Sequence, residues 1–292
     1  MIIFNGQQLD NVEYNGVNLD KVIFNGVIVY EKIEESGTTV FILHNDSKSD
    51  KTVNLRIRVE EAPVVINGYS PNNANYNFNY TATTTGSKSY AFNIPAYGEY
   101  RIELTGGKIK GYSDTAELFS EGNIFTSATI SSNVTNTNNW LFEADVRELT
   151  INAPININID TAEYLETLNI QKATSIEAIK YTALTQLTIP ASVQSIEQYS
   201  LGYNYELEEV HILGSNTVLN SSLFYQDYGL QDVYIYSTVP AATQGSWFYG
   251  SYPTIHLSHT LDIDQARELF GSSFNTYREG KDTITLDTVF DL

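Results

Sequence analysis

Few side chains in this sequence have the types and spacing of catalytic residues. The strongest candidate is a pair of carboxylates that could act in glycoside hydrolysis. Glu209 and Asp232 hold equivalent positions in two similar segments. If the segments form adjacent strands, the carboxylates lie roughly 4.8 Å apart, near the separation of about 5 Å used by retaining glycosidases. However, the 35 acidic residues of the chain produce such pairs by chance. Because the sequence supplies no orienting partner, we expect a protein that is not an enzyme, and a polysaccharide depolymerase is the third of three functions considered.

Metal and cofactor sites are not expected. His256 and His259 are three residues apart, so on a strand they face opposite sides and do not share a metal ion. Asp262 and Asp264 lack the glycine turn and distal glutamate of a calcium-binding loop, and capping of a helix is the better interpretation. The absence of cysteine excludes thiolate nucleophiles, disulfides and cysteine-based metal sites. We therefore expect no catalytic residue, no metal and no cofactor.

The charge balance narrows the range of partners. Sixteen basic residues against 35 acidic ones give a formal charge of −19, which repels nucleic acid and anionic cell-wall phosphates. Neutral sugars or proteins are easier partners. No run approaches the roughly 18 apolar residues of a membrane helix, so no membrane insertion is expected. The first residues lack the basic and apolar regions of a secretory signal, which predicts synthesis in a host cytoplasm without export.

The most regular pattern is a motif of the form Leu-x-x-Leu-x-Ile, in which Val, Tyr or Phe can replace Leu. Its central positions are separated by 19, 19, 23, 23 and 22 residues, and Ala128 marks a degenerate copy 21 residues upstream. A second apolar position follows the motif, at Ile176, Ile196 and Leu219. Two apolar positions per repeat predict a leucine-rich solenoid over residues 108–260. The central residues are Leu149, Leu168, Leu187, Val210, Val233 and Ile255.

Residues between the buried positions of this motif point outward and form columns across the coils. A column that carries rings at one end is the candidate ligand face, because polar groups and rings can bind a glycan or a peptide. A solvated sheet face, in which Thr and Tyr only stabilise strands, explains the column equally well. Tyr205 and Tyr228 are expected to stack from coil to coil. Core or inter-coil packing is favoured for the loop rings, and rings exposed together would mark an interaction edge. The column contains Thr150, Asn169, Thr188, His211, Tyr234 and His256.

Three further segments complete a mostly β fold. Residues 1–35 carry Asn-Gly pairs every ten residues, which predict a β-meander of tight hairpins for docking to another protein. Residues 36–107 contain runs of alternating residues and predict a β-sandwich of immunoglobulin-like size that ends at Gly106-Gly107. Residues 261–292 predict a C-terminal cap with a helix at 261–270. The expected docking turns are Asn5, Gly6, Asn15, Gly16, Asn25 and Gly26.

The repeat at residues 184–201, with Leu-Thr-Gln-Leu-Thr-Ile-Pro followed by Ser-Ile and an aromatic residue, resembles the leucine-rich repeats of BspA-type surface antigens. The resemblance covers about residues 120–260 and lacks the family's Cys and Ala-Phe pair. The Asn-Gly decapeptides resemble N-terminal segments of structural proteins from phages of Gram-positive bacteria. Together the two resemblances imply a tail, baseplate or head-fibre protein of a phage.

These observations predict a non-enzymatic virion protein for host attachment. Residues 1–35 are expected to contact other virion proteins, and the solenoid a host-surface glycan or protein. The alternative is a leucine-rich adhesin on a bacterial surface. The sequence contains no heptad pattern and leaves the oligomeric state open, a homo-oligomer included.

Overall fold

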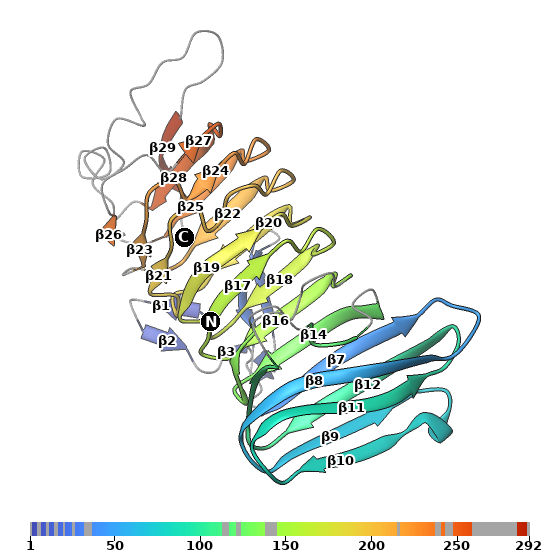
Figure 1. Cartoon of the computed structure of the whole chain (residues 1–292). Coiled ribbons are helices and arrows are strands. Elements are labelled where there is room, and N and C mark those ends of the chain that lie inside the picture. The colour runs from blue at the N-terminus through green and yellow to red at the C-terminus, as the bar shows by residue number, and fades with distance from the viewer. Residues whose placement is uncertain are drawn as a thin grey trace. The chain divides into compact units, whose positions relative to one another are not determined.

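The strands of the chain fall into two units, Met1–Ser36 and Gly37–Leu292. The computed structural model (Figure 1) describes six short strands in the first unit and, in the second, residues 37–112, 117–120, 124–137, 145–214, 217–236, 241–242, 248–258 and 285–290. Within these residues the only helical element is a 3₁₀ turn, η1 (Ala74–Tyr76), so the expected mostly β fold is confirmed. The same residues contain no helix with the length and hydropathy needed to cross a membrane.

The first unit consists of three β-hairpins. Phe4 pairs with Gln7, Tyr14 with Val17 and Phe24 with Val27, so each hairpin has two residues between its strands, where the sequence has Asn-Gly. Each hairpin is a two-stranded sheet of its own, and the single meander expected over residues 1–35 is not shown. The six Asn and Gly residues expected as docking turns lie outside the described residues. The strands are β1 (Ile2–Phe4), β2 (Gln7–Leu9), β3 (Val12–Tyr14), β4 (Val17–Leu19), β5 (Lys21–Phe24) and β6 (Val27–Glu31).

The second unit begins with two facing sheets. Alternating side chains of the long strands are buried between the sheets, as in β8, where Val53, Leu55, Ile57 and Val59 point inward. One sheet has the order β10-β9-β12-β7 and the other the order β11-β8-β13-β15. The strands are β7 (Thr38–Asn45), β8 (Lys51–Glu61), β9 (Val64–Tyr69), β10 (Phe78–Ala82), β11 (Gly86–Ile94), β12 (Gly98–Thr105), β13 (Lys108–Gly111) and β15 (Val134–Asn136).

The glycine pair expected as a boundary forms the turn between β12 and β13. Gly107 has a φ of +47°, and a Cβ there would lie 2.1 Å from the carbonyl oxygen of Glu61, so only glycine fits. The strand after this turn, β13, pairs with β8. The expected boundary therefore lies within hydrogen-bonded strands.

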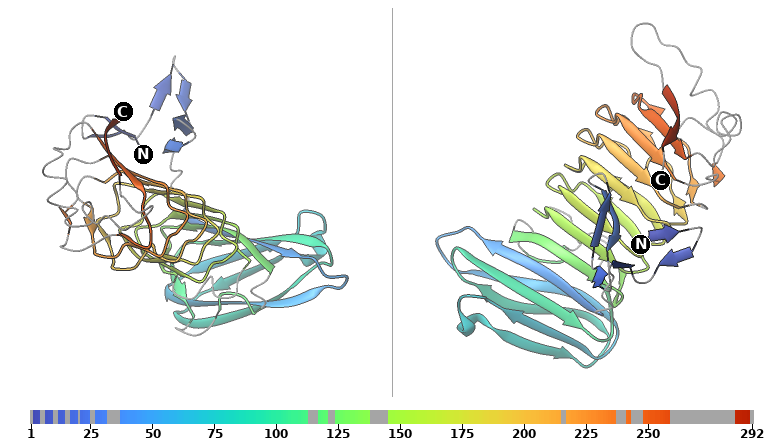
Figure 2. Two further views of the ribbon diagram at one scale, coloured as in Figure 1. Left: turned by 90° about the horizontal axis from the view of Figure 1, so that it is seen from above. Right: turned by 180° about the vertical axis from the view of Figure 1, so that it is seen from behind.

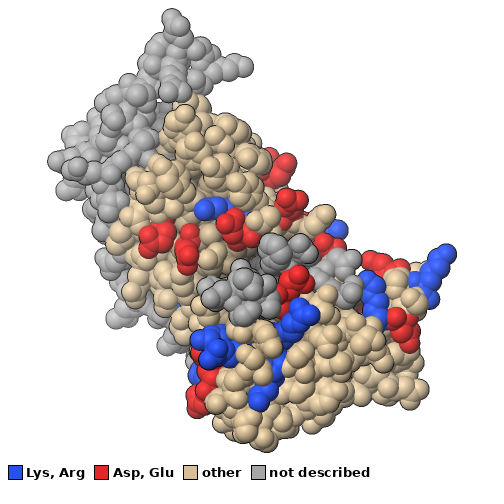
Figure 3. Space-filling model, viewed as in Figure 1, with Lys and Arg blue, Asp and Glu red and all other residues tan. Residues whose placement is uncertain are grey.

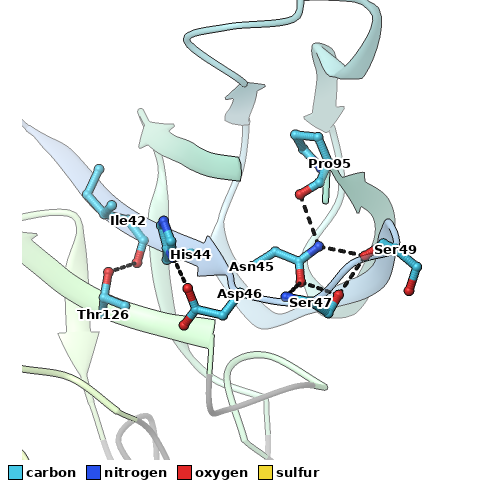
Figure 4. Close-up of polar contacts among 8 residues, drawn as sticks. All are labelled: Ile42, His44, Asn45, Asp46, Ser47, Ser49, Pro95 and Thr126. Atoms are coloured by element: carbon cyan, nitrogen blue, oxygen red, sulfur yellow. Dashed lines mark hydrogen bonds and ion pairs between the residues drawn. The ribbon is translucent and has the colours of Figure 1, made fainter. Parts of the chain in front are cut away.

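The first sheet continues directly into the solenoid. Strand β14 (Phe125–Ser131) pairs antiparallel with β7 on one side and parallel with β16 (Glu148–Asn152) on the other. Ala128 is in register with Leu149, which confirms that residues 125–130 are a first copy of the repeat. The hydroxyl of Thr126 also donates a hydrogen bond to the Ile42 carbonyl at 3.3 Å (Figure 4). One continuous hydrophobic core runs from Phe41 to Ile255 as a result.

The solenoid has two rows of parallel strands, which lie over one another when viewed from above (Figure 2). In one row Leu187, Val210, Val233 and Ile255 are in register, and in the other Ile176, Ile196 and Leu219 are in register. Both predicted apolar positions of the repeat are thus confirmed. The first row is β16, β18 (Thr167–Ile170), β20 (Gln186–Ile189), β22 (Glu209–Ile212), β25 (Asp232–Ile235), β28 (Thr254–Ser258) and β29 (Thr285–Phe290). The second row is β17 (Asn156–Asp160), β19 (Ser175–Lys180), β21 (Ser195–Ile196), β23 (Val218–Leu219) and β26 (Ala241–Ala242), and the pair β24 (Phe224–Tyr225) and β27 (Phe248–Tyr249) lies at a corner.

The C-terminal part is described only in its last strand. Strand β29 pairs parallel with β28, which places Leu286 in register with Ile255. The helix expected at residues 261–270 lies outside the described residues, so a helical cap is not shown.

A ladder of polar side chains runs inside the coils. The carboxamide oxygen of Asn204 accepts hydrogen bonds from the backbone and hydroxyl of Thr182, at 3.1 and 2.8 Å. In the next coil Asp227 Oδ1 accepts a hydrogen bond from the backbone N–H of Asn204 at 2.7 Å. Asp227 Oδ2 is buried without a partner among the described residues, and burial raises the pKa of Asp227 to about 8. Asp227 is therefore protonated near neutral pH, and its uncharged carboxyl group takes the role that the Asn204 carboxamide has in the previous coil.

A second buried polar residue closes the turn between β7 and β8. The Asn45 amide donates to the carbonyls of Ser49, Ile94 and Pro95 at 3.0, 3.3 and 3.0 Å, as Figure 4 shows in part. Its oxygen accepts from the backbone and hydroxyl of Ser47. One fully buried side chain thus bonds five groups, three in the turn between β7 and β8 and two at the end of β11, and joins the two segments.

We expect Asn45→Ala to lower the free energy of unfolding by about 2–4 kcal/mol, because buried carbonyls lose their donors. Urea denaturation followed by fluorescence measures the change. Asn72→Ala, at an exposed position, is the matched control and should stay within about 0.5 kcal/mol of the unmodified chain. Equal stability of both variants would contradict the role assigned to Asn45.

Asp227→Asn is expected to stabilise the protein at pH 8 and to have a diminishing effect toward pH 4. Between the unfolded and folded pKa values the folded state holds a proton that the unfolded state has released, so stability falls as pH rises. One pKa unit of difference is worth about 1.4 kcal/mol, so a gain of a few kcal/mol is expected at pH 8. Unfolding curves at pH 4, 6 and 8 test this. The exposed Glu197→Gln should show the pH dependence of the unmodified chain.

Candidate functional site

The predicted ring column exists on the first strand row of the solenoid. His211, Tyr234 and His256 are in register on β22, β25 and β28. The centroids of His211 and Tyr234 are 4.6 Å apart with planes at 4°, and those of Tyr234 and His256 are 4.3 Å apart at 9°. The three rings therefore form one continuous face-to-face stack.

Carboxylates and a phenol orient the two imidazoles. Glu209 Oε1 lies 2.7 Å from His211 Nε2, and a carboxylate only accepts, so Nε2 carries the proton. In neutral His211 the other nitrogen, Nδ1, then accepts from the hydroxyl of Tyr236 at 2.9 Å. Asp232 Oδ1 likewise accepts from His256 Nε2 at 2.7 Å. These bonds hold the ring edges in place on the sheet.

This geometry changes how the column can meet a ligand. Each ring covers the face of its neighbour, so Tyr234 has no open face for a sugar, and a ligand meets ring edges instead. His211 is only 4% exposed, and both of its nitrogens are hydrogen-bonded within the chain. The stack therefore organises the sheet face, and within it only Tyr234 and His256 are half-exposed.

The remaining members of the column continue it toward the sandwich. Thr150 is in register with Asn169, and Thr188 with His211, whereas β18 and β20 belong to different sheets. Thr150, Asn169 and Thr188 lie half-exposed. The structure adds Thr129, which is in register with Thr150. The degenerate motif at residues 125–130 is the sequence feature from which Thr129 could have been assigned to the column.

The carboxylate pair has no arrangement suited to hydrolysis. Glu209 and Asp232 are in register on adjacent strands, as predicted, but each is bound to an imidazole. Tyr236, His211 and Glu209 form a hydroxyl–base–acid series, yet burial raises the pKa of Tyr236 to about 12, with Tyr234 and Glu209 adding to the effect. A phenol that resists ionisation is a poor nucleophile. Among the described residues there is also no cluster of three or more His, Cys, Asp or Glu that could hold a metal ion.

A second surface lies at a corner of the coils, where tyrosines recur from one coil to the next. Tyr205 and Tyr228 stack at 6.1 Å and 10°, as predicted. They are 49% and 63% exposed, so the predicted packing between coils is confirmed for this pair, and burial in the core is not. The interior at this corner is filled instead by Phe224 and Phe248, which stack at 5.3 Å.

A longer column of tyrosines stands beside this pair. Tyr181 and Tyr203 stack at 5.0 Å, Tyr203 and Tyr225 contact at 5.4 Å, and Tyr225 and Tyr249 stack at 4.8 Å. Burial and the neighbouring phenols, including Tyr228, raise the pKa of Tyr225. We call this surface the tyrosine edge, made of Tyr181, Tyr203, Tyr205, Tyr225, Tyr228 and Tyr249.

Comparison with known families agrees with the coils seen here. Residues 162–255 match the family model described as the BspA type leucine-rich repeat region, in six copies. No curated protein and no solved structure matches the chain. The match covers the tyrosine edge and two rings of the stack, His211 and Tyr234, and it ends one residue before His256. Strands β14 and β16 extend the strand row before the match.

Tyr236→Phe is expected to destabilise the solenoid by about 1–3 kcal/mol, because the buried Nδ1 of His211 loses its donor. Thermal and urea unfolding measure the loss. Tyr252→Phe, at a half-buried position of the next coil, serves as the comparison. If Tyr236→Phe were as stable as the unmodified chain, the hydrogen-bonded order of the stack would be refuted.

Proposed function

We propose that this protein is a non-enzymatic attachment protein whose solenoid binds a molecule of a host-cell surface. The observation that carries the proposal is the solenoid itself: BspA-type repeats stacked in register, with a polar column and a row of exposed tyrosines repeated from coil to coil. Repeated side chains on a stacked scaffold give a broad contact area rather than one deep pocket. Several copies on one particle would add avidity to weak contacts.

We further propose that the first unit docks the protein to a phage particle through residues 1–35. Three hairpins of three to five residues per strand are too small to bury a core of their own, so a partner surface would complete them. The resemblance of the Asn-Gly decapeptides to phage structural proteins supports this location. In this proposal the partners are other virion proteins at one end and a host-surface glycan or protein at the other.

A leucine-rich adhesin on a bacterial surface is the second candidate. It is favoured by the type of repeat that matches, since the BspA-type repeats resembled by the sequence belong to surface antigens. In both candidate functions the solenoid is the binding part. They differ in whether the protein is attached to a phage particle or to a bacterial surface.

Immunogold labelling of phage particles from an induced culture, with antibody against residues 108–292, tests the location. Gold at the tail tip is the expected result, gold on the head or neck would make the protein a head fibre, and gold on cell walls alone would favour the bacterial adhesin. A chain lacking residues 1–35 should unfold at the same temperature yet fail to join particles. Normal incorporation of that chain would overturn the docking proposal.

A further inference from the structure

The tyrosine edge presents polar atoms that the protein itself does not use. Tyr228 and Tyr249 are more than half exposed, at 63% and 53%. None of the six hydroxyls makes a hydrogen bond within the part of the chain that the structure describes. Rings that serve only to fill space need no hydroxyl, so a repeated row of open phenol oxygens indicates contact with another molecule.

Backbone conformation adds a second observation. Tyr181 and Tyr203 have φ values of +52° and +66°, in the left-handed region that glycine and asparagine adopt at lower cost. A non-glycine residue there costs of the order of 1–2 kcal/mol. Tyrosine at both corners therefore comes at the expense of stability, as is common where side chains serve a function.

The charges around the edge define the partner. Residues 151–258 contain ten acidic side chains, of which Asp227 is buried and protonated, and two basic ones, which gives −7 near neutral pH. Glu206 and Glu208 are exposed beside Tyr205, whereas Asp160 is in register with Lys180 next to Tyr181, so the excess of carboxylates lies at Tyr205. In the view of Figure 3, acidic side chains along the solenoid outnumber basic ones, whereas the sandwich carries both signs. Anionic ligands are repelled from such a surface and cationic ones attracted.

Ring geometry separates a cationic polypeptide from a neutral glycan. Sugars stack on open ring faces, but the planes of Tyr181 and Tyr203 meet at 11° and those of Tyr225 and Tyr249 at 7°, so the rings largely cover one another. A guanidinium group instead donates in its own plane to phenol and carboxylate oxygens, so it binds at ring edges and needs no open ring face.

We propose that the tyrosine edge is a binding site for a basic polypeptide, which places arginine side chains between the phenol oxygens and the neighbouring carboxylates. The inference rests on the proposed binding function and adds the chemistry of the partner. It predicts a preference for arginine over lysine, because an attraction by charge alone would treat the two equally.

Isothermal titration calorimetry of the full chain with deca-arginine, deca-lysine and maltoheptaose tests the inference. We expect deca-arginine to bind most tightly and maltoheptaose not to bind. Exchange of Tyr205, Tyr228 and Tyr249 for phenylalanine keeps the rings and the net charge, and should weaken deca-arginine binding about tenfold. Tyr228→Ala should weaken it about threefold. The matched control is Tyr97→Ala, at a tyrosine of the sandwich that is 62% exposed, and it should have no effect.

Two outcomes would overturn the inference: equal deca-arginine affinity in all variants, which means attraction by charge alone, or tighter binding of maltoheptaose. Attachment of the labelled chain to host cells is measured in parallel. Cell attachment with equal peptide affinity in all variants would refute the basic-peptide site and leave the proposed function standing. Tyrosine-dependent binding of deca-arginine without cell attachment would refute the attachment function and leave the site standing.

Discussion

The backbone pairing of β14 with β7 is the contact on which the second unit depends. A stack of parallel coils exposes the hydrogen-bonding groups and apolar side chains of its first coil, and an uncovered end is unstable. Here the antiparallel sandwich strand β7 supplies the hydrogen-bonding partner, so the first coil is an additional strand of an existing sheet. The sandwich therefore covers the N-terminal end of the solenoid, and the two share one core.

Polar groups inside and on the coils keep the stack in register. Thr182, Asn204 and Asp227 bond from coil to coil in the interior, and the His211–Tyr234–His256 stack repeats the same spacing outside. Apolar contacts tolerate small shifts, whereas a buried hydrogen bond is lost when its partner moves. This ladder includes a buried acid, Asp227, whose carboxyl group must stay protonated. An asparagine at this position would accept the same hydrogen bond without having to hold a proton.

The two ring systems have different consequences for function. The imidazoles of the strand face are bound by carboxylates and covered by neighbouring rings, so that surface is already largely satisfied within the chain. The corner tyrosines stack as well, but their hydroxyls point to no partner in the described part of the chain. The surface proposed here to bind a partner is therefore the corner, and not the sheet face on which the sequence predicted the ligand site.

The amino-acid sequence by itself determined the repeat. Each coil buries an apolar side chain at the same position, so the spacing of these positions can be recognised even where Val or Ile replaces Leu. Register along Leu187, Val210, Val233 and Ile255, the ring column and the degenerate copy at Ala128 all followed from it. Only the tertiary structure decided how the parts join and which rings are exposed. Pairing between β7 and β14 joins residues some 85 positions apart and leaves no local signal. Likewise, Phe224 and Tyr228 are aromatic residues four positions apart in the sequence. Only the path of the backbone through the corner decides that Tyr228 is exposed to solvent and that Phe224 is buried in the core.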